Sequence, residues 1–309
     1  MKTLTVFTPT YNRAHTLERT YRSLCSQTCK DFEWMVIDDG STDDTRTLIA
    51  RLANEDRLTI HYIHKENGGL HTGYNTAYAN IRTPLCVCVD SDDYMPPRAV
   101  ELILDTWRKR GSDRYAGIIG LDHYAETDRP IGGGFPDGLK ECYLLDLYTH
   151  DIHYGDTKQV MRTELMRRVA PQTGFEGERF FNPIYMLLQV CDEYPLLVLN
   201  ENLCMVDYGV GDNMSRAIFR QYTDSPRSFA KLRLQAMSLK RSTFAYRLRA
   251  AIHYVAECLI ARDGDWLRNS PRKLTTLCMA PLGMALWAYI RYRVWRMERG
   301  KKTIIENNK

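Results

Sequence analysis

The stretch Leu85–Pro97, LCVCVDSDDYMPP, joins a short apolar run to a cluster of carboxylates. The apolar part follows a proline and has about five apolar positions without alternation, which predicts a short buried strand. Three acids, Asp90, Asp92 and Asp93, therefore stand at the end of that strand. Carboxylates this close raise one another's pKa unless a cation or hydrogen-bond donors offset their charge, so a folded domain needs a reason to keep them together.

Two explanations of this acid cluster stay open from the stretch alone. Mg²⁺ and Mn²⁺ prefer oxygen ligands, and substrate phosphates often complete their shell. An acidic turn that caps a helix beginning near Pro96 would also place aspartates here. A calcium loop is excluded, because its sixth position would be Met95 instead of glycine and two prolines occupy the loop.

The chain before this stretch alternates predicted strands with predicted helices. Strands are expected at 4–7, over FEWMVIDD (32–39) and at 58–63, and an amphipathic helix is expected at 16–27. This order predicts an α/β fold with a mostly parallel sheet and right-handed crossovers, in which the loops at the carboxyl ends of the strands gather at one edge. One crevice should therefore be lined by the acid cluster together with Tyr11, Asp39 and Asn67.

Two acidic strand ends and a glycine turn at one edge favour a pocket for a nucleoside diphosphate with a divalent ion. The carboxylates would hold the metal and nucleoside hydroxyls, and the metal would offset the charge of the phosphates. Neither GxGxxG nor GxxxxGK[ST] occurs in the sequence. A dinucleotide fold and a phosphate-binding P-loop are therefore not supported.

Three segments in this order resemble the family 2 glycosyltransferases, inverting enzymes with a GT-A fold that use sugar nucleotides. They are TPTYNRAHTLERTYRSLCSQTCKDFEWMVIDDGSTDDT (8–45), ENGGLHTGYNTA (66–77) and VDSDDYMPP (89–97). The resemblance covers roughly residues 1–215. It implies a catalytic domain over 1–219, with a nucleotide-sugar half of about 1–98 and an acceptor half of about 99–219.

The resemblance also implies a site for the nucleotide. Pro9 and Tyr11 lie where the family contacts the nucleobase, and Asp39 lies where a carboxylate accepts a hydrogen bond from the base. Capping of the next helix is the alternative role for Asp39. Asn67 and Gly69 belong to the loop on the nucleotide side, although a tight turn with positive φ would use the same residues.

A metal site is implied at the acid cluster, where Asp90 and Asp92 match the DxD element of the family. Asp92 is expected to be the direct metal ligand, and Asp90 to contact the ribose or the metal shell; Asp93 is a reserve candidate. The implied cofactor is Mn²⁺ or Mg²⁺. The implied donor is a nucleotide sugar, with a UDP-sugar favoured because uridine is the commoner nucleotide in the family.

The general base is expected in the segment 171–190, with Glu178 as first and Glu176 as second candidate; a polar loop or helix start would account for either. Pro183 stands where resembling family members have a further acid. This departure leaves a catalytically inactive nucleotide-sugar-binding subunit as an alternative. A third hypothesis is a nucleotidyltransferase, but such an enzyme would need a basic glycine-rich loop that TPTYNRAHTLERT lacks.

The last part of the chain differs in charge from the rest. Residues 1–219 carry 23 Lys and Arg against 32 Asp and Glu, a net of −9, and 220–309 carry 19 against 6, a net of +13. A basic helical C-terminal region over 220–309 is therefore predicted. Within it, Leu274–Ile290 is apolar, shorter than the ~20 residues of a bilayer span, and followed by arginines.

This apolar segment and its basic flank predict an interfacial helix or hairpin against an anionic membrane. A helical appendage packed on the catalytic domain is the alternative. No nucleic-acid-binding motif accompanies the positive charge, so nucleic acid is not expected as a partner.

Nine cysteines without CxxC spacing argue for reduced thiols in the cytoplasm and against a zinc site or a disulfide framework. The first residues, MKTLTVFTPTYNR, contain too short an apolar run for a signal peptide. The prediction is therefore a cytoplasmic enzyme at the inner face of the plasma membrane. It would transfer a sugar with inversion to a hydroxyl of a glycan or lipid-linked acceptor, in cell-surface polysaccharide or glycolipid synthesis.

Overall fold

The computed structural model describes residues 2–208 and 218–307, with the backbone alone at 298 and 300–307. Two compact units divide the chain. The first comprises 1–172 with 183–211, and the second comprises 173–182 with 212–309. Both predicted base candidates, Glu176 and Glu178, therefore belong to the second unit, and the acid cluster belongs to the first. The division of roles into a catalytic domain and a basic C-terminal region stays a prediction.

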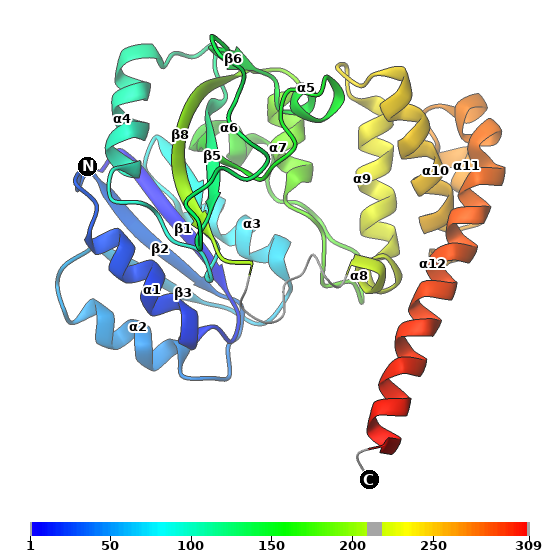
Figure 1. Ribbon diagram of the computed structural model, residues 1–309, viewed down its shortest axis with the longest axis horizontal. Helices are drawn as coiled ribbons and strands as arrows, with labels where there is room; N and C mark the ends of the chain where they lie inside the picture. The colour runs from blue at the N-terminus through cyan, green and yellow to red at the C-terminus, as the bar shows by residue number, and fades with distance from the viewer. Residues whose placement is uncertain (1, 209–217, 308–309) are drawn as a thin grey trace. The chain divides into compact units, whose positions relative to one another are not determined.

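The first unit is built on an eight-stranded sheet in the order β3-β2-β1-β4-β7-β5-β8-β6 (Figure 1). The strands are β1 (Leu4–Thr10), β2 (Phe32–Asp38), β3 (Ile60–His64), β4 (Leu85–Cys88), β5 (Gly117–Tyr124), β6 (Glu141–Cys142), β7 (Thr157–Arg162) and β8 (Leu196–Val206). β7 is antiparallel to both β4 and β5, and β6 is antiparallel to β8, while the other pairs are parallel. The carboxyl ends of β1 to β5 and of β8 therefore lie at one edge.

Helices cover both faces of this sheet. They are α1 (Ala14–Cys25), α2 (Thr45–Ala53), α3 (Leu70–Asn80), α4 (Ala99–Arg110), α5 (Leu144–Thr149), α6 (Thr163–Val169) and α7 (Ile184–Cys191). Val6 of β1 packs in one core with residues of α1, α2 and α4. The next residue, Phe7, meets Tyr74 and Tyr78 of α3 edge-on, at ring distances of 5.2 and 5.6 Å. Burial on both faces explains why these strands read as continuous apolar runs.

The predicted α/β fold with a mostly parallel sheet is confirmed. In α1, Leu17, Tyr21 and Leu24 recur at helical spacing and have no exposed surface. The antiparallel insertion of β7 between β4 and β5 was not predicted. It makes the sheet continuous across both predicted halves of the catalytic domain.

The second unit is helical, as predicted for the C-terminal region. Its helices are α8 (Ile218–Asp224), α9 (Pro226–Ser238), α10 (Phe244–Ala261), α11 (Trp266–Asn269) and α12 (Lys273–Asn307). α12 is one continuous helix with Pro281 inside it, so the hairpin alternative is wrong. Gly283 brings α12 close to α10, because a Cβ at this glycine would lie 2.6 Å from Cβ of Val255.

Candidate active site

The acid cluster forms a turn after β4 that α1 holds in place. The backbone N–H of Asp93 donates to the carbonyl of Asp90 at 3.0 Å and closes the turn. Two consecutive side chains of α1 donate to its carbonyls, Arg19 to that of Asp92 at 2.5 Å and Thr20 to that of Asp93 at 2.8 Å. The turn is thus fixed from outside through its backbone, which leaves the side chains of Asp90 and Asp92 available.

The same face of α1 continues this contact beyond the turn. Ser23 accepts from the backbone N–H of Met95 at 3.2 Å. The Gln27 side chain donates to the carbonyl of Pro96 at 2.9 Å and accepts from the N–H of Val100 at 3.1 Å. Positions 19, 20 and 23 lie on one side of α1, and Gln27 lies two residues beyond the end of that helix. α1 and the residues that directly follow it therefore set the path of the chain from the acid cluster to the start of α4.

The alternative that the acids cap the following helix is wrong. α4 begins at Ala99, the side chain of its N-cap residue Arg98 makes no capping hydrogen bond, and the N–H of Val100 in its first turn donates to Gln27. The acid cluster lies several residues earlier and makes a separate turn. Its carboxylates therefore need another explanation than helix capping.

The two carboxylates of the predicted DxD element are available to a ligand. Within the described residues, the Asp92 carboxylate takes part in no hydrogen bond or ion pair. Among the same described residues, the Asp90 carboxylate accepts only a weak bond from the Cys88 thiol, at 3.7 Å. The protein packed around Asp90 raises the pKa of its carboxyl, and the charge of Asp92 adds to this, although the side chain reaches solvent.

Beneath the turn lies a buried lysine that the sequence analysis missed. Lys158, at the start of β7, is 9% exposed, and its ammonium lies 3.6 Å from the carboxylate of Asp122 on β5, which is 2% exposed. Burial alone would lower the pKa of Lys158, but Asp122, Asp93 and Asp90 outweigh it and raise that pKa well above its ordinary value. Burial raises the pKa of Asp93 to about 8 and that of Asp122 to about 6, and Lys158 opposes both shifts.

Asp90 and Asp92 fit a divalent ion that shares its shell with a substrate. In the described part of the chain, no three His, Cys, Asp or Glu side chains converge in a ready-made metal cage. Mg²⁺ and Mn²⁺ are commonly held by one or two carboxylates, waters and substrate phosphates, and Asp92 supplies an unengaged carboxylate. The donor set therefore suits an ion that arrives with a diphosphate.

Asp39, at the end of β2, fastens the glycine turn that precedes α3. Its Oδ1 accepts from the N–H of Gly68 at 3.0 Å and from the Lys65 ammonium at 2.5 Å, and its Oδ2 accepts from the N–H of Gly69 at 2.8 Å. A carboxylate has about four acceptor positions, so Oδ2 keeps one for a further donor. The Asp39 residue is 6% exposed, which places that acceptor at the base of the edge instead of on the open surface.

The alternative role of Asp39 as a cap of α2 is wrong. That helix starts at Thr45, and it is the Asp43 carboxylate that accepts from the Thr45 N–H, at 3.1 Å. The neighbouring Asp38 is fully buried and accepts from the Tyr62 hydroxyl at 2.5 Å and from the Ser41 N–H at 2.8 Å. Asp38 is therefore a structural residue, and Asp39 is the one at the edge.

The remaining predicted nucleotide residues lie at the ends of β1 and before α3. Tyr11 is 47% exposed just after β1, and Pro9 is buried in that strand, against Gly73 of α3. Asn67 donates from its side chain to the carbonyl of Asp39 at 2.8 Å, and Gly69 has a φ of +89°, so both also shape the turn. The structure thus brings Pro9, Tyr11, Asn67 and Gly69 to the same edge as Asp39.

Asn12 is a residue of this edge that the sequence analysis missed. It follows Tyr11 with a φ of +54°, its N–H donates to Ser41 at 2.9 Å, and its side chain accepts from the N–H of Thr42 at 2.7 Å. The loop after β1 is thereby attached to the loop after β2. Asn is one of the few residues that tolerates this backbone conformation, which was the available signal.

The two base candidates differ in their surroundings within the second unit. Glu178 is buried, and its two carboxylate oxygens accept from the backbone N–H groups of Arg227 at 2.9 Å and Ser228 at 2.7 Å, in the first turn of α9. Glu176 is exposed, and its carbonyl accepts from the Arg227 side chain. Glu178 therefore has a structural role as the cap of α9, and the catalytic role of either residue stays a prediction. Pro183 directly precedes α7.

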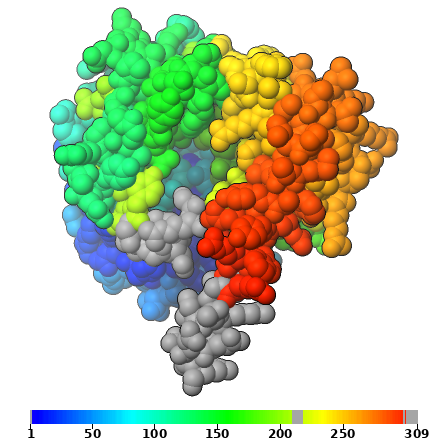
Figure 2. All heavy atoms as spheres, turned by 45° about the vertical axis from the view of Figure 1, so that its right-hand side comes forward, coloured from blue at the N-terminus to red at the C-terminus, as the bar shows by residue number. Residues whose placement is uncertain are grey.

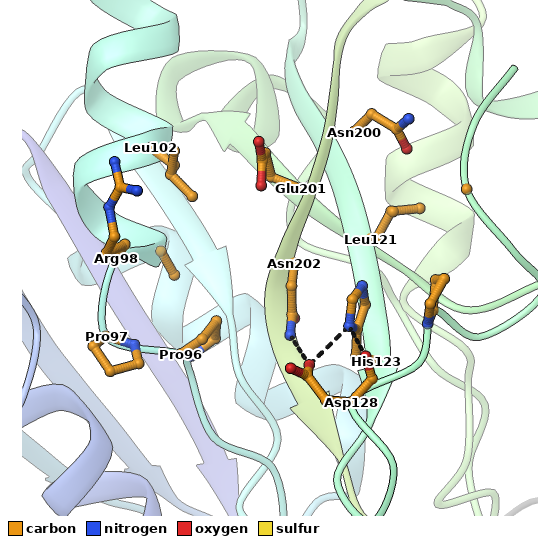
Figure 3. A pocket seen from close by; sticks show the side chains of 13 residues that line it. Pro96, Pro97, Arg98, Leu102, Leu121, His123, Asp128, Asn200, Glu201 and Asn202 are labelled. Carbon is orange, nitrogen blue, oxygen red and sulfur yellow. Dashed lines mark hydrogen bonds and ion pairs between the residues drawn. The ribbon is translucent and has the colours of Figure 1, made fainter. Parts of the chain in front are cut away.

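A shallow hollow of about 570 Å³ lies between the start of α4 and strands β5 and β8 (Figure 3). Leu121 and His123 line it, whereas Asp122 between them points to the opposite face of β5, toward Lys158. His123 and Asn202 both contact the Asp128 carboxylate, at 3.0 and 3.1 Å. None of the predicted site residues lines this hollow, so it is a surface separate from the acid cluster.

The protein thus has a mixed α/β sheet with acids and a glycine turn at the carboxyl edge of its parallel strands. The pattern of glycosyl transferase family 2 matches residues 5–166, more than half of the 309 residues. The chain therefore belongs to glycosyl transferase family 2.

Relatives and solved structures agree with this membership. Chondroitin synthase of Escherichia coli is 39% identical over 107 residues, which make up 34% of this chain and only 15% of that synthase. Residues 1–349 of Staphylococcus aureus TarS, solved with UDP-GlcNAc, align with a TM-score of 0.59 at 20% identity over 94% of this chain and 88% of that one. The mannosyltransferase PcManGT of Pyrobaculum calidifontis, solved with GDP-Man and Mn²⁺, gives 0.55 at 19% identity over 94% and 82%. The predicted GT-A fold is confirmed.

Proposed function

We propose that the protein transfers a sugar from a nucleoside-diphosphate sugar to a hydroxyl group of a glycan or lipid-linked acceptor, with inversion. The observation that carries this proposal is the shared position of Asp39 and Asp92. Both follow strands that end at the same edge of one sheet, one with a spare acceptor and the other with an unengaged carboxylate. The relation to a chondroitin synthase favours a polysaccharide as product.

The residues at this edge would divide the work of binding the donor. Asp39 would accept from the nucleobase through Oδ2, with Tyr11 exposed beside it and Asn67 and Gly69 shaping the turn. Asp92, with Asp90 next to it, would hold a divalent ion, which would stabilise the negative charge of the departing diphosphate. We favour uridine as the nucleoside because uridine is the commoner nucleotide in the family that the sequence resembles.

Inversion requires the acceptor hydroxyl to attack the anomeric carbon from the face opposite the diphosphate, with a base that takes its proton. Glu176 and Glu178 are the proposed bases. Glu176 is solvent-exposed. Glu178 has both oxygens engaged by backbone donors, so as a base it would first have to release the cap of α9.

The donor experiment measures nucleoside diphosphate release by the full chain with Mn²⁺ and a panel of UDP-, GDP- and TDP-sugars, with and without membrane extract. Release that requires the extract supports the transferase. Asp92→Asn should lose Mn²⁺-dependent donor binding, while Asp128→Asn, in the separate hollow, should keep it. If the wild-type protein binds no nucleotide sugar in the presence of Mn²⁺, the proposed function is wrong.

Two alternatives give different results in the same assay. Saturable donor binding without turnover in any extract would identify an inactive binding subunit. Release of pyrophosphate from a nucleoside triphosphate and a sugar phosphate would identify a nucleotidyltransferase. Either result would replace the transferase proposal.

We further propose that the protein works at the cytoplasmic face of a membrane, with α12 as its contact. Eight large apolar or aromatic side chains of α12, the helix that runs from orange to red in Figure 2, are 37% to 81% exposed, namely Leu274, Leu277, Leu282, Met284, Trp287, Tyr289, Tyr292 and Trp295. By length and composition alone, Lys273–Met297 could cross a membrane. Part of the helix is packed, since Thr276, Ala280 and Ile290 are buried, which favours a helix lying in the headgroup layer.

The charge around this helix favours an anionic lipid surface. No charged residue occurs from Leu274 to Ile290, and the next ten residues contain four arginines, at 291, 293, 296 and 299. Each basic residue near an anionic surface contributes on the order of 1 kcal/mol. The aromatic residues Trp287, Tyr289, Tyr292 and Trp295 suit the level of the headgroups.

Vesicle sedimentation tests this contact. The wild-type protein should bind vesicles rich in phosphatidylglycerol, and binding should weaken with salt and with phosphatidylcholine alone. Leu282→Ser with Trp287→Ser should reduce binding, while Tyr154→Ser, an exposed aromatic residue of the first unit, should not. Concentration-dependent dimerisation through α12 without vesicle binding would show that a second copy covers this face, and the membrane proposal would be wrong.

A further inference from the structure

Arg19 on α1 joins two separate parts of the chain at the acid cluster. Its Nη2 donates to the carbonyl of Asp92 at 2.5 Å, and its Nη1 donates to the carboxylate of Asp207 at 2.7 Å. The guanidinium carbon lies 5.1 Å from the centre of the Tyr94 ring. The guanidinium therefore contacts Asp92 of the acid cluster, the nearby Tyr94, and Asp207, which directly follows β8.

The end of β8 also meets the turn through the backbone. The N–H of Tyr94 donates to the carbonyl of Met205 at 3.2 Å, and the N–H of Met205 donates back at 2.7 Å. Asp207 lies two residues beyond this pair. Arg19 thus adds side-chain hydrogen bonds to Asp207 and Asp92 beside the backbone pair that already joins the turn to β8.

This ion pair is more than an ordinary surface contact. The Arg19 side chain is 39% exposed and that of Asp207 is 14% exposed, so water screens the pair only in part. The guanidinium uses two nitrogens in fixed directions, which a lysine ammonium on a flexible stem cannot reproduce. Replacement by lysine should therefore preserve the charge and lose the double contact.

We propose that Arg19 is a positioning residue for Asp92. It holds the peptide of Asp92 against α1 and Asp207, so that the Asp92 carboxylate keeps the place in which it binds the metal and diphosphate of the donor. This inference rests on the proposed function. It adds that metal-dependent affinity for the donor depends on a side chain that acts through its contacts with Asp92, Tyr94 and Asp207.

Arg22 provides a matched control on the same helix. It lies three residues further along α1, its side chain is 45% exposed, and its partners are Glu18 and Glu55 at 3.0 Å. Neither partner belongs to the acid cluster. Arg22→Ala therefore removes an arginine and its ion pairs from α1 without touching the turn.

The test is calorimetric binding of UDP to the full chain, with Mn²⁺ and without metal, for wild type, Arg19→Ala, Arg19→Lys, Arg22→Ala and Asp207→Asn. We expect Arg19→Ala to weaken Mn²⁺-dependent UDP binding by about tenfold or more, since hydrogen bonds to charged groups are lost. Arg19→Lys and Asp207→Asn should weaken it less. UDP binding without metal in all variants, and all UDP binding by Arg22→Ala, should stay at wild-type values.

If the role of Arg19 were purely structural, Arg19→Ala would lower the thermal stability and would reduce UDP binding with and without Mn²⁺ in parallel. That result would overturn the proposal. If Arg19→Ala does not fold, Arg19→Lys and Asp207→Asn still decide, because unchanged Mn²⁺-dependent affinity in both would overturn it too. Absence of Mn²⁺-dependent binding of UDP, GDP and TDP by the wild type would instead remove the proposed function itself. The two failures are therefore distinguishable.

Discussion

Replacing Glu178 with glutamine should loosen the start of α9. The carboxylate accepts from the N–H groups of Arg227 and Ser228 at 2.9 and 2.7 Å, and the Arg227 Nε lies 3.4 Å away. Glutamine retains one acceptor, but its NH₂ group faces an N–H donor, and only 4% of the Glu178 side chain is exposed to water that could compensate. The lost charge-assisted bond and the lost favourable charge at a helix N-terminus together cost about 2–4 kcal/mol.

Hydrogen exchange measures this cost locally. The amides of Arg227 and Ser228 should exchange about 30-fold faster or more in Glu178→Gln, because 2 kcal/mol of lost protection corresponds to about that factor. Urea denaturation followed by circular dichroism should give a lower midpoint. Glu176→Gln, two residues away and exposed, should change neither measurement. Unchanged exchange in α9 together with abolished turnover would refute the capping role and support Glu178 as the base.

Three further predictions concern separate parts of the molecule. Asp39→Asn should lower nucleotide affinity by about tenfold, measured by calorimetry, because an amide loses charge-assisted acceptance from the base. Burial raises the pKa of Glu257 to about 7, although the charge of Arg233, 3.3 Å away, acts to lower it. Burial also lowers the pKa of the neighbouring His253 to about 4. The folded pKa of Glu257 exceeds its ordinary value, so this group's stabilisation is complete at low pH and declines, by on the order of 3 kcal/mol, as pH rises from about 4.5 to above 7. Glu257→Gln should remove that decline in denaturation measured across pH, and the exposed Asp265→Asn should not. Gly283→Val should destabilise the second unit by about 1–3 kcal/mol through overlap with α10, while Gly264→Ala, where a Cβ meets nothing, should be neutral in the same assay.

The sequence was sufficient for the nucleotide half of the sheet because its signals are local. Apolar runs of strand length ended in acids, and apolar residues recurred at helical spacing in α1, so β1, β2, β4 and their edge could be predicted. Parallel strands then had to place Asp39 and the acid cluster at one edge. The structure adds that Asp92, and not Asp38, has an unengaged carboxylate there.

The residues that the sequence did not reveal depend on contacts between distant positions. Lys158 reaches the acid cluster because β7 runs antiparallel, which brings the beginning of that strand to the edge where the other strands end. A single lysine within a short strand carries no such signal. Likewise, the capping contact between Glu178 and α9 joins residues about fifty positions apart, so nothing in GFEGERFF indicates it.

The placement of β7 also affects the chain while it is being synthesised. β4 pairs with β1 on one side and β7 on the other, yet Thr157 follows Cys88 by 69 residues. A nascent chain that has completed β4 therefore presents an apolar strand with one open side until β7 has left the ribosome, and such strands invite aggregation. Asp90, Asp92 and Asp93 stand directly beside that open strand, where negative charges act as gatekeepers against association between chains. The same aspartates that we assign to the donor would thus protect the unfinished protein.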